Sequence, residues 1–208
     1  MRWGLFGGTF DPIHRGHVDT VRRARQVAEL DRVLYLPTAR PPHRPDHEPA
    51  SPWARHVMAE LALLDDRELQ VSAHELTPDR PAYTVETLEH FRDRRPEDIL
   101  HLILGSDSLA ELTTWRRWRD LVGLARLVVL ARPGWEPREV REEMSGELHD
   151  LLFGDAPDGA PAPPVVVEVS VDVSATEIRR RLARGKEPPK GWLHPRVVDY
   201  LDKYDLYR

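Results

Sequence analysis

Residues 4–17 read GLFGGTFDPIHRGH, and this stretch decides how the chain is expected to fold. The apolar run before the glycine pair predicts a buried strand, whereas residues 18–30 have the apolar spacing of a helix. The loop between them follows the carboxyl end of a strand, where open α/β sheets bind ligands and helix N-termini attract anions. Gly8 would let a ligand approach the backbone, since no Cβ stands in the way. His14 and His17 would offer hydrogen-bond donors to phosphate oxygens, so the stretch predicts a phosphate site.

Outward from this loop, short apolar strands alternate with helical patterns along the chain. This alternation predicts a Rossmann-like α/β fold with a mostly parallel sheet. We expect one domain over residues 1–208, with the C-terminal helical segment 174–208 packed on it. After the first strand, further strands are expected at residues 32–37, 69–76, 99–104, 127–131 and 165–169. Helices are expected at residues 18–30, 51–64, 83–94, 115–124, 136–153 and 195–207, and from residue 174 onward.

The composition excludes several classes of protein. The 208 residues contain no Cys, which excludes a disulfide framework, thiol catalysis and a thiolate metal site. A net charge of −5 gives no general basic surface for nucleic acid, so no nucleic-acid partner is expected. No apolar run approaches the roughly 20 residues that span a bilayer, and residues 1–3 lead directly into a strand. We therefore expect no membrane association, no signal peptide and a cytoplasmic location.

Two common nucleotide-binding motifs are absent from the sequence. All but three of the 30 Lys and Arg residues are Arg, and no Lys follows a glycine-rich loop, which excludes a P-loop. The dinucleotide motif Gly-x-Gly-x-x-Gly is also missing, which argues against hydride transfer. His14 and His17 lack a nearby third ligand, so a zinc site is not favoured. A pair of histidines that only pack within the loop is the remaining alternative.

A second anion-binding pattern lies near the other end of the chain, at residues 174–179 (SATEIR). Ser174 and Glu177 have the Ser-x-x-Glu spacing of a capping box, so a helix is expected to begin here. Helix capping does not account for Thr176 or Arg179. A helix N-terminus with a hydroxyl group and a guanidinium group in its first turn can hold an anion. Together with the loop at residues 7–17, it would hold one triphosphate between two helix N-termini.

These two patterns carry a resemblance to a known family. The run GGTFDPIHRGH resembles the Gly-Gly-Thr-Phe-Asp-Pro-Ile-His-x-Gly-His motif of bacterial nicotinate-nucleotide adenylyltransferases, in the (H/T)xGH nucleotidyltransferase superfamily. Residues 173–179 resemble the family's Ile-Ser-x-Thr-x-Ile-Arg motif, with Val173 in place of the first Ile. The resemblance extends from Gly7 to Tyr207. It implies a three-layer nucleotidyltransferase fold, in which the last helix is structural.

The resemblance implies adenylyl transfer from ATP to nicotinate mononucleotide, which gives deamido-NAD and pyrophosphate. A phosphomonoester is mostly a dianion at pH 7, so the attacking phosphate needs no general base. His14, His17 and Arg179 are therefore interpreted as catalytic residues that donate to phosphate groups. The resemblance also implies Mg²⁺ carried by the ATP phosphates, mostly with water ligands, and no dedicated metal site. The residues assigned to ATP binding are Gly8, Thr9, Gly105, Asp107, Ser174 and Thr176.

Binding of the nicotinate nucleotide is assigned to a second set of residues by the same resemblance. Trp115 matches a position that contacts the pyridine ring, and the alternative is a core residue in a helical stripe with Trp118. Residues 41–44 (PPHR) match a segment beside the active site, and a solvated linker is an equal alternative. The residues assigned to this substrate are His43, Arg44, Tyr83, Thr84, Trp115 and Arg132.

Two other functions stay open. Phosphopantetheine adenylyltransferases share the HxGH-type and Ser-x-Thr-type motifs and the same mechanism, but they would not explain Tyr83 and Thr84 or Trp115. A non-catalytic nucleotide sensor on the same fold belongs to another class. The joint presence of His14, His17 and Arg179 argues against the sensor, because binding alone needs fewer such residues. Release of pyrophosphate from ATP would separate an enzyme from a sensor.

Overall fold

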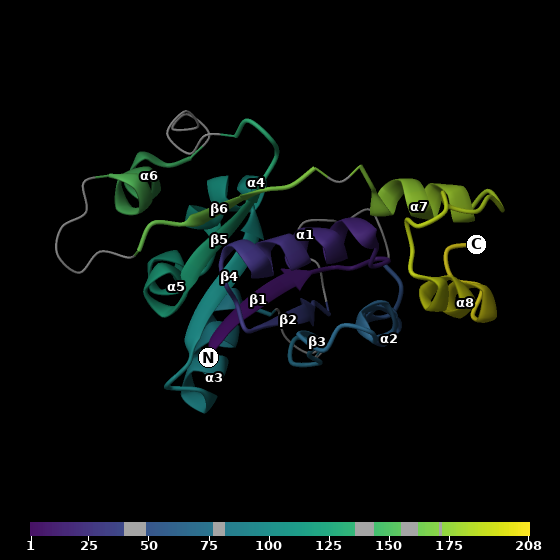
Figure 1. The fold of residues 1–208 in the computed structure, drawn as a ribbon, viewed down its shortest axis with the longest axis horizontal. Helices are drawn as coiled ribbons and strands as arrows, with labels where there is room; N and C mark the ends of the chain where they lie inside the picture. The colour runs from purple at the N-terminus through teal and green to yellow at the C-terminus, as the bar shows by residue number, and fades with distance from the viewer. Residues whose placement is uncertain (40–48, 77–81, 136–143, 155–161, 171) are drawn as a thin grey trace. The chain divides into compact units, whose positions relative to one another are not determined.

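The computed structural model describes residues 1–39, 49–76, 82–135, 144–154, 162–170 and 172–208. These residues contain a six-stranded parallel sheet with the strand order β3-β2-β1-β4-β5-β6 (Figure 1). From β1 the chain first adds β2 and β3 on one side, and it then returns to add β4, β5 and β6 on the other. This order is that of doubly wound α/β folds, so the predicted Rossmann-like sheet is confirmed. The strands are β1 (Arg2–Gly8), β2 (Arg32–Pro37), β3 (Leu69–Val71), β4 (Ile99–Gly105), β5 (Arg126–Ala131) and β6 (Val165–Glu168).

The middle strands are nearly continuous apolar runs, as expected where both faces of a parallel sheet are covered. In β4 and β5, Leu102 pairs with Leu127, and both side chains are buried. Val128 and Val129 are adjacent in β5 and have no exposed surface, so both faces of this strand are buried. The pattern of residues 99–104 and 127–131 therefore predicts these two strands correctly.

The third strand is shorter than its pattern predicts, since β3 ends at Val71 rather than at residue 76. The backbone N–H of Ser72 still donates to the Tyr35 carbonyl at 2.9 Å. The Ser72 hydroxyl then accepts a hydrogen bond from the backbone N–H of His74 at 3.2 Å. A serine side chain that binds the local backbone in this way favours a turn, and the chain leaves the sheet. The side chain of Leu76 is buried, but this residue lies after the turn and outside β3.

The helices begin and end close to the predicted residues in most cases. The Ser51 hydroxyl accepts the Ala54 N–H at 3.2 Å and caps a helix that has Pro52 at its first position, as predicted. The first helix begins before residue 18, because the His14 carbonyl already accepts the His17 N–H at 2.9 Å. The helical segments are α1 (Arg15–Val27), α2 (Pro52–Leu63), α3 (Thr84–Arg94), α4 (Ser106–Ala110), the 3₁₀ segment η1 (Leu112–Thr114), α5 (Trp118–Leu124), α6 (Gly146–Phe153), α7 (Ala175–Leu182) and α8 (Pro195–Lys203).

Three predicted helices are shorter in the structure. Trp115 has an extended backbone after η1, and Arg117 adopts a left-handed conformation with φ of 53°, so α5 begins only at Trp118. α6 begins only after Ser145, whose hydroxyl accepts the Leu148 N–H at 3.2 Å. Residues 136–143 of that predicted helix lie outside the described residues. α8 ends at Lys203, and the chain then turns through residues 204–207.

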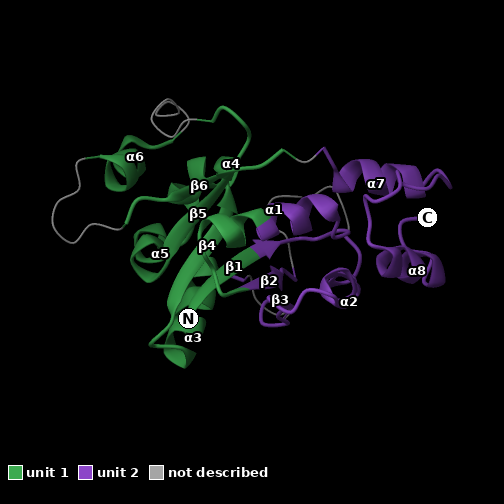
Figure 2. Ribbon diagram, viewed as in Figure 1, with its two compact units in different colours: residues 1–6, 23–32, 83–170 green, residues 7–22, 33–82, 171–208 purple. Residues whose placement is uncertain are grey.

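The described chain divides into two compact units, coloured separately in Figure 2, and each is described by itself. Unit 1 comprises residues 1–6, 23–32 and 83–170, and α3 packs against α5 within it. Unit 2 comprises residues 7–22, 33–82 and 171–208. Within unit 2, α2 packs against β3 and α8, and the side chains of Met58 and Val197 are completely buried. Unit 2 therefore contains the first loop, which comprises residues 8–17, together with α2 and the C-terminal segment from residue 172 onward.

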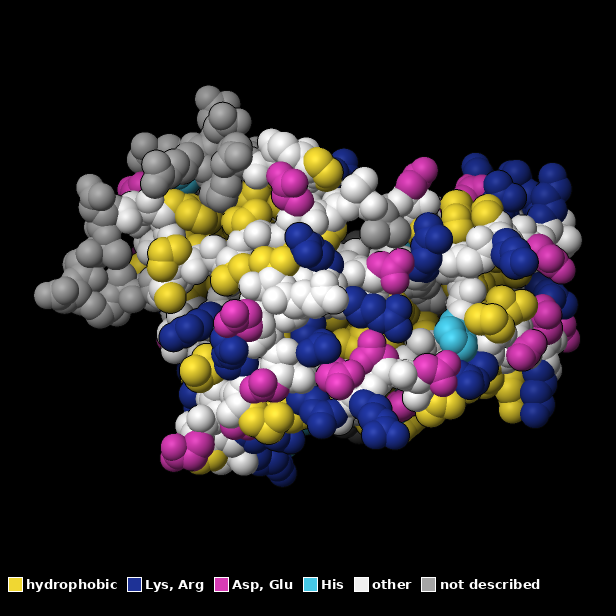
Figure 3. Space-filling view, in the orientation of Figure 1, with side chains coloured by type: hydrophobic (Ala, Val, Ile, Leu, Met, Phe, Trp, Pro, Cys, Tyr) yellow, Lys and Arg dark blue, Asp and Glu magenta, His cyan; other side chains and the backbone are white. Residues whose placement is uncertain are grey.

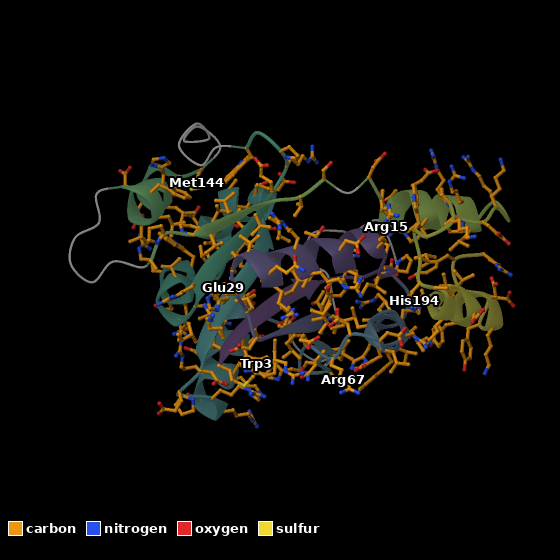
Figure 4. The ribbon with its side chains drawn as sticks, viewed as in Figure 1. Trp3, Arg15, Glu29, Arg67, Met144 and His194 are labelled. Atoms are coloured by element: carbon orange, nitrogen blue, oxygen red, sulfur yellow. The ribbon has the colours of Figure 1, made fainter. Side chains whose placement is uncertain are left out.

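The surface of the described residues carries charges of both signs. Figure 3 shows acidic and basic side chains mixed over the visible face, in agreement with a net charge of only −5. None of the helices in the described ranges combines the length and the apolar character needed to cross a bilayer.

Candidate active site

The first loop, residues 8–17, is built around a buried aromatic ring. Phe10 has a φ of 51°, which is uncommon for a residue other than Gly, and its side chain is only 2% exposed. A Cβ added to Gly8 would lie 2.8 Å from the Phe10 ring, so the loop requires glycine at this position. The Phe10 ring also meets the His17 ring edge-on, with 5.2 Å between centroids. Phe10 therefore positions His17, and the sequence signal of this role is an apolar residue within a polar loop.

The two histidines of the loop lie against each other. Their rings are stacked with centroids 3.7 Å apart and an angle of 23° between planes. The backbone N–H of His14 donates to Nδ1 of His17 at 3.2 Å, and the Tyr35 hydroxyl donates to the His17 carbonyl at 3.2 Å. Since Nδ1 accepts, the neutral His17 ring carries its hydrogen on Nε2. Nε2–H is therefore the atom of His17 that can donate to a ligand.

Both histidines are neutral near pH 7. Burial lowers the pKa of His14 to about 4, and its side chain is 8% exposed. Burial also lowers the pKa of His17 well below its usual value, and the positive charge of His14 lowers it further. Two cationic rings in stacked contact would repel each other. The pair therefore offers neutral N–H groups as donors. The Nδ1 atom of His14 is buried and has no hydrogen-bond partner among the described residues.

These shifts predict that acid destabilises the fold through the histidine pair. A buried histidine with a lowered pKa binds fewer protons than it does in the unfolded chain, so its stabilising effect is complete above about pH 6.5 and declines toward the folded pKa of about 4. From pH 7 to pH 5, we expect protonation of His14 in the unfolded chain to lower the free energy of unfolding by roughly 2 kcal/mol. Urea denaturation at both pH values, in wild type and in His14→Asn, measures this. Equal pH dependence in the two proteins would contradict the assignment.

The second predicted motif reaches the first loop through Arg179, in α7. Nη1 of Arg179 donates to the Asp11 carbonyl at 2.6 Å, and Nη2 donates to the Thr176 hydroxyl at 3.4 Å. The Arg179 side chain is 13% exposed. The structure therefore brings Arg179 to the loop that contains His14 and His17, all within unit 2.

The capping box at the start of α7 forms only in part. The Ser174 hydroxyl accepts the Glu177 N–H at 3.4 Å, as predicted for the N-cap. The Glu177 carboxylate does not complete the box; it accepts a hydrogen bond from Arg181 at 2.8 Å and pairs with Arg180. Ser174 and Thr176 are exposed at this helix start, where an anion could reach them. Arg180 and Arg181 bind the Glu177 carboxylate in place of the backbone N–H of Ser174. The Ser-x-x-Glu spacing does not reveal this competition.

A completely buried arginine, Arg55 in α2, holds the first loop through a hydrogen bond to its backbone. Its guanidinium group donates to the carbonyls of Thr9 at 2.6 Å, Thr38 at 2.7 Å and Ala39 at 3.2 Å, and its Nε donates to the Ala50 carbonyl at 2.9 Å. Burial lowers the pKa of Arg55, and the charge of Asp11 opposes this effect. No local sequence pattern indicates this role of Arg55, because its partners are backbone carbonyls that only the fold brings together.

Unit 1 contains the residues that sequence resemblance assigns to the pyridine ring. Tyr83 is the N-cap of α3 and Thr84 its first residue, and the Tyr83 side chain makes no capping hydrogen bond. The Arg116 guanidinium lies 4.5 Å above the Tyr83 ring and 3.4 Å from Glu86. Trp115 is half-buried and lies outside α5, so the expected alternative of a helical stripe with buried Trp118 is wrong.

The other residues predicted to bind ATP or the nicotinate nucleotide lie near the ends of β4 and β5 or outside the described residues. Gly105 is the N-cap of α4, and Asp107 is exposed in the first turn of that helix. Arg132 is exposed directly after β5. His43 and Arg44 lie outside the described residues. Among the residues that are described, no three His, Asp or Glu side chains are grouped so that they could hold a metal ion.

Comparisons with known proteins agree with these motifs. Residues 5–181 match the cytidylyltransferase-like family model. The chain is 41% identical over its whole length to a probable nicotinate-nucleotide adenylyltransferase of Thermus thermophilus, which it covers completely. It is 35% identical to the corresponding protein of Acidithiobacillus ferrooxidans, with 98% of this chain and 94% of that protein covered.

A solved structure shares the fold at lower sequence identity. Nicotinic acid mononucleotide adenylyltransferase of Plasmodium falciparum, complexed with NaAD, superimposes with a TM-score of 0.75 at 17% identity. The match covers 99% of this chain and 97% of that protein, so the predicted nucleotidyltransferase fold is confirmed. With full-length identities of 34–41% to curated relatives, the chain belongs to the nicotinate-nucleotide adenylyltransferase family.

Proposed function

We propose that the protein transfers the adenylyl group of ATP to nicotinate mononucleotide and releases pyrophosphate, as one step of NAD biosynthesis. One observation carries this proposal. The stacked rings of His14 and His17 lie in the first loop of unit 2, and Arg179 donates a hydrogen bond to Asp11 of the same loop. The names of relatives that are 41% identical over the whole chain support the same reaction. The product of the reaction is deamido-NAD.

In the proposed reaction, an oxygen of the nicotinate nucleotide's phosphate attacks the α-phosphorus of ATP. A bond forms between that oxygen and the α-phosphorus, and the bond from the α-phosphorus to the bridging oxygen breaks as pyrophosphate leaves. The nucleophile is mostly a dianion at pH 7, so no proton has to be removed. Catalysis then depends on positioning the two anions and on stabilising the charge that develops.

Each residue of the first loop and of α7 has a proposed task in this step. The Nε2–H of His17 donates to an α-phosphate oxygen, with His14 beside it as a second donor. Arg179, with Ser174 and Thr176, holds the β- and γ-phosphates that leave. A guanidinium group has five N–H donors, so Arg179 can keep its bond to Asp11 and still bind phosphate. The backbone of Gly8 and Thr9 lines the phosphate path.

The remaining assignments complete the proposal. Gly105 and Asp107 bind the ATP ribose, where the carboxylate of Asp107 accepts from a hydroxyl group. Mg²⁺ arrives bound to the ATP phosphates and keeps mostly water ligands. We also propose a cytoplasmic location and a chain that works as one domain over residues 1–208. The residues proposed to bind the nicotinate nucleotide are His43, Arg44, Tyr83, Thr84, Trp115 and Arg132.

The enzyme is expected to prefer the nicotinate nucleotide to the nicotinamide nucleotide. The Tyr83 side chain does not cap α3, so an amide group at this helix start, such as that of Thr84, can donate to a carboxylate. The neutral amide of nicotinamide offers one acceptor oxygen and places an NH₂ group against such donors. An unpaired donor costs about 1–3 kcal/mol, so kcat/KM should differ by roughly 5- to 150-fold.

Steady-state kinetics with both nucleotides and with phosphopantetheine measures this preference. Trp115→Ala serves as the comparison variant, because a ring face would bind both pyridinium rings and the variant should weaken both nucleotides alike. Equal use of the two nucleotides by the wild-type protein would contradict the proposed selectivity. Turnover of phosphopantetheine alone would indicate the related adenylyltransferase. Failure to release pyrophosphate with any acceptor would indicate a sensor.

A further inference from the structure

The buried carboxylate of Asp11 stands between Arg179 and the C-terminal tail of the chain. Asp11 is 3% exposed, and a carboxylate is costly to bury unless it is paired and hydrogen-bonded. One of its oxygens accepts the Ala50 N–H at 3.0 Å and also the hydroxyl group of Tyr207. The other oxygen lies 3.7 Å from Nη1 of Arg179. All of these residues belong to unit 2.

Tyr207 reaches this carboxylate from the second-last position of the chain. It adopts a φ of 65°, a conformation that residues other than Gly rarely adopt, and its side chain is half-buried. Burial and the charge of Asp11 raise the pKa of Tyr207, so the phenol stays protonated and donates. Tyr204 lies in the same tail, but it is 55% exposed. The tail therefore directs one particular tyrosine to Asp11.

The separation between Asp11 and Arg179 matters because carboxylate and phosphate compete for the same guanidinium group. Arginine binds both anions through paired N–H···O bonds. At 3.7 Å the Asp11 oxygen attracts Arg179 but lies too far away for a hydrogen bond. The direct bond of Arg179 goes to the Asp11 carbonyl, at 2.6 Å. The other carboxylate oxygen of Asp11 accepts hydrogen bonds from the Tyr207 hydroxyl group and the Ala50 N–H.

We propose that Tyr207 is a positioning residue for Arg179: its hydroxyl group holds the Asp11 carboxylate and keeps it from capturing the guanidinium group that binds the triphosphate. This inference rests on the proposed function in assigning the triphosphate to Arg179. Removal of the hydroxyl group in Tyr207→Phe leaves one carboxylate oxygen with a donor fewer. The carboxylate then turns toward Arg179, and ATP and pyrophosphate lose part of their binding site.

The test measures the Kd of ATP and of inorganic pyrophosphate by isothermal titration calorimetry in wild type, Tyr207→Phe and Tyr204→Phe. We expect both Kd values to rise roughly tenfold in Tyr207→Phe, the loss that corresponds to about one charge-assisted hydrogen bond. The exposed control Tyr204→Phe should bind as the wild type does. In steady-state kinetics, the KM for ATP should rise while the KM for nicotinate mononucleotide stays unchanged.

A double-mutant cycle shows whether Tyr207 acts through the charge of Asp11. In an Asp11→Asn background the carboxylate charge is gone, so Tyr207→Phe should change the Kd of pyrophosphate by less than twofold. If Asp11→Asn does not fold, the comparison of Tyr207→Phe with Tyr204→Phe still decides the proposal. Unchanged Kd values in Tyr207→Phe would overturn it. An equal rise in KM for both substrates, with a lower melting temperature, would show a merely structural role and also overturn it.

Failure of this proposal can be distinguished from failure of the proposed function. If the wild-type protein binds neither ATP nor pyrophosphate, the proposed function fails and this inference fails with it. If the wild type binds both and Tyr207→Phe binds them equally well, only the role of Tyr207 is wrong.

Discussion

Replacement of His17 by alanine is expected to lower kcat by about 10²–10³ while the protein stays folded, because loss of a transition-state donor typically has this effect. The Nδ1 atom of His17 accepts the His14 N–H at 3.2 Å, which leaves Nε2–H to face a phosphate oxygen. The His17 side chain is half-buried, and its ring meets the buried Phe10 ring edge-on. Saturating concentrations of both substrates separate the effect on kcat from effects on binding.

Two comparisons make the His17 result specific. His90→Ala removes a histidine that lies in α3, in unit 1, and it should keep both kcat and the melting temperature. His17→Ala should keep most of its melting temperature and lose its turnover. Near-normal kcat in His17→Ala would show that the ring is a packing residue of the loop, which is the alternative that the sequence left open.

Replacement of Arg179 by lysine is expected to lower kcat/KM for ATP by roughly 10- to 150-fold. Lysine keeps the positive charge, but it lacks the planar fork that binds a phosphate through two N–H groups. Loss of one bond to a charged group is worth about 1.5–3 kcal/mol, which sets this range. The cap of α7 is formed by Ser174 and is not touched by the substitution, so the melting temperature should barely move.

The matched control for Arg179→Lys is the neighbouring Arg180→Lys. Arg180 lies in the same helix, is exposed and pairs with Glu177, so its replacement should leave kcat/KM for ATP unchanged. A large loss of melting temperature in Arg179→Lys, together with normal turnover, would assign Arg179 to the stability of the fold. Normal values for both quantities would remove it from the site.

The fold could be predicted from the sequence wherever one segment carries its own signal. β4 and β5 are apolar runs bounded by turn residues, and α2 has Ser51 and Pro52 at its start, so local chemistry determines these elements. The prediction was wrong at β3, where the Ser72 hydroxyl forms a turn within an apolar pattern. It was also wrong at residues 115–124, where Arg117 adopts a left-handed conformation that no local residue type announces.

In the candidate site too, the local motif could be predicted from the sequence, whereas the long-range contacts could not. The spacing of His14 and His17 fixes both residues near one helix start, so the motif alone places them together. The support of the loop could not be predicted, because its partners are distant in sequence. Arg55 reaches Thr9 across 46 positions, and Tyr207 reaches Asp11 across 196. Such contacts depend on tertiary structure and leave no periodic pattern.

Transfer of the adenylyl group of ATP by this chain can be followed with two radioactive labels. ATP labelled with ³²P at the α-phosphate, and separately at the γ-phosphate, is incubated with the wild-type protein, Mg²⁺ and nicotinate mononucleotide. We expect the α-label to appear in deamido-NAD and the γ-label in pyrophosphate, in equal amounts. Release of the γ-label as orthophosphate, or an α-label that never joins the nicotinate nucleotide, would contradict it.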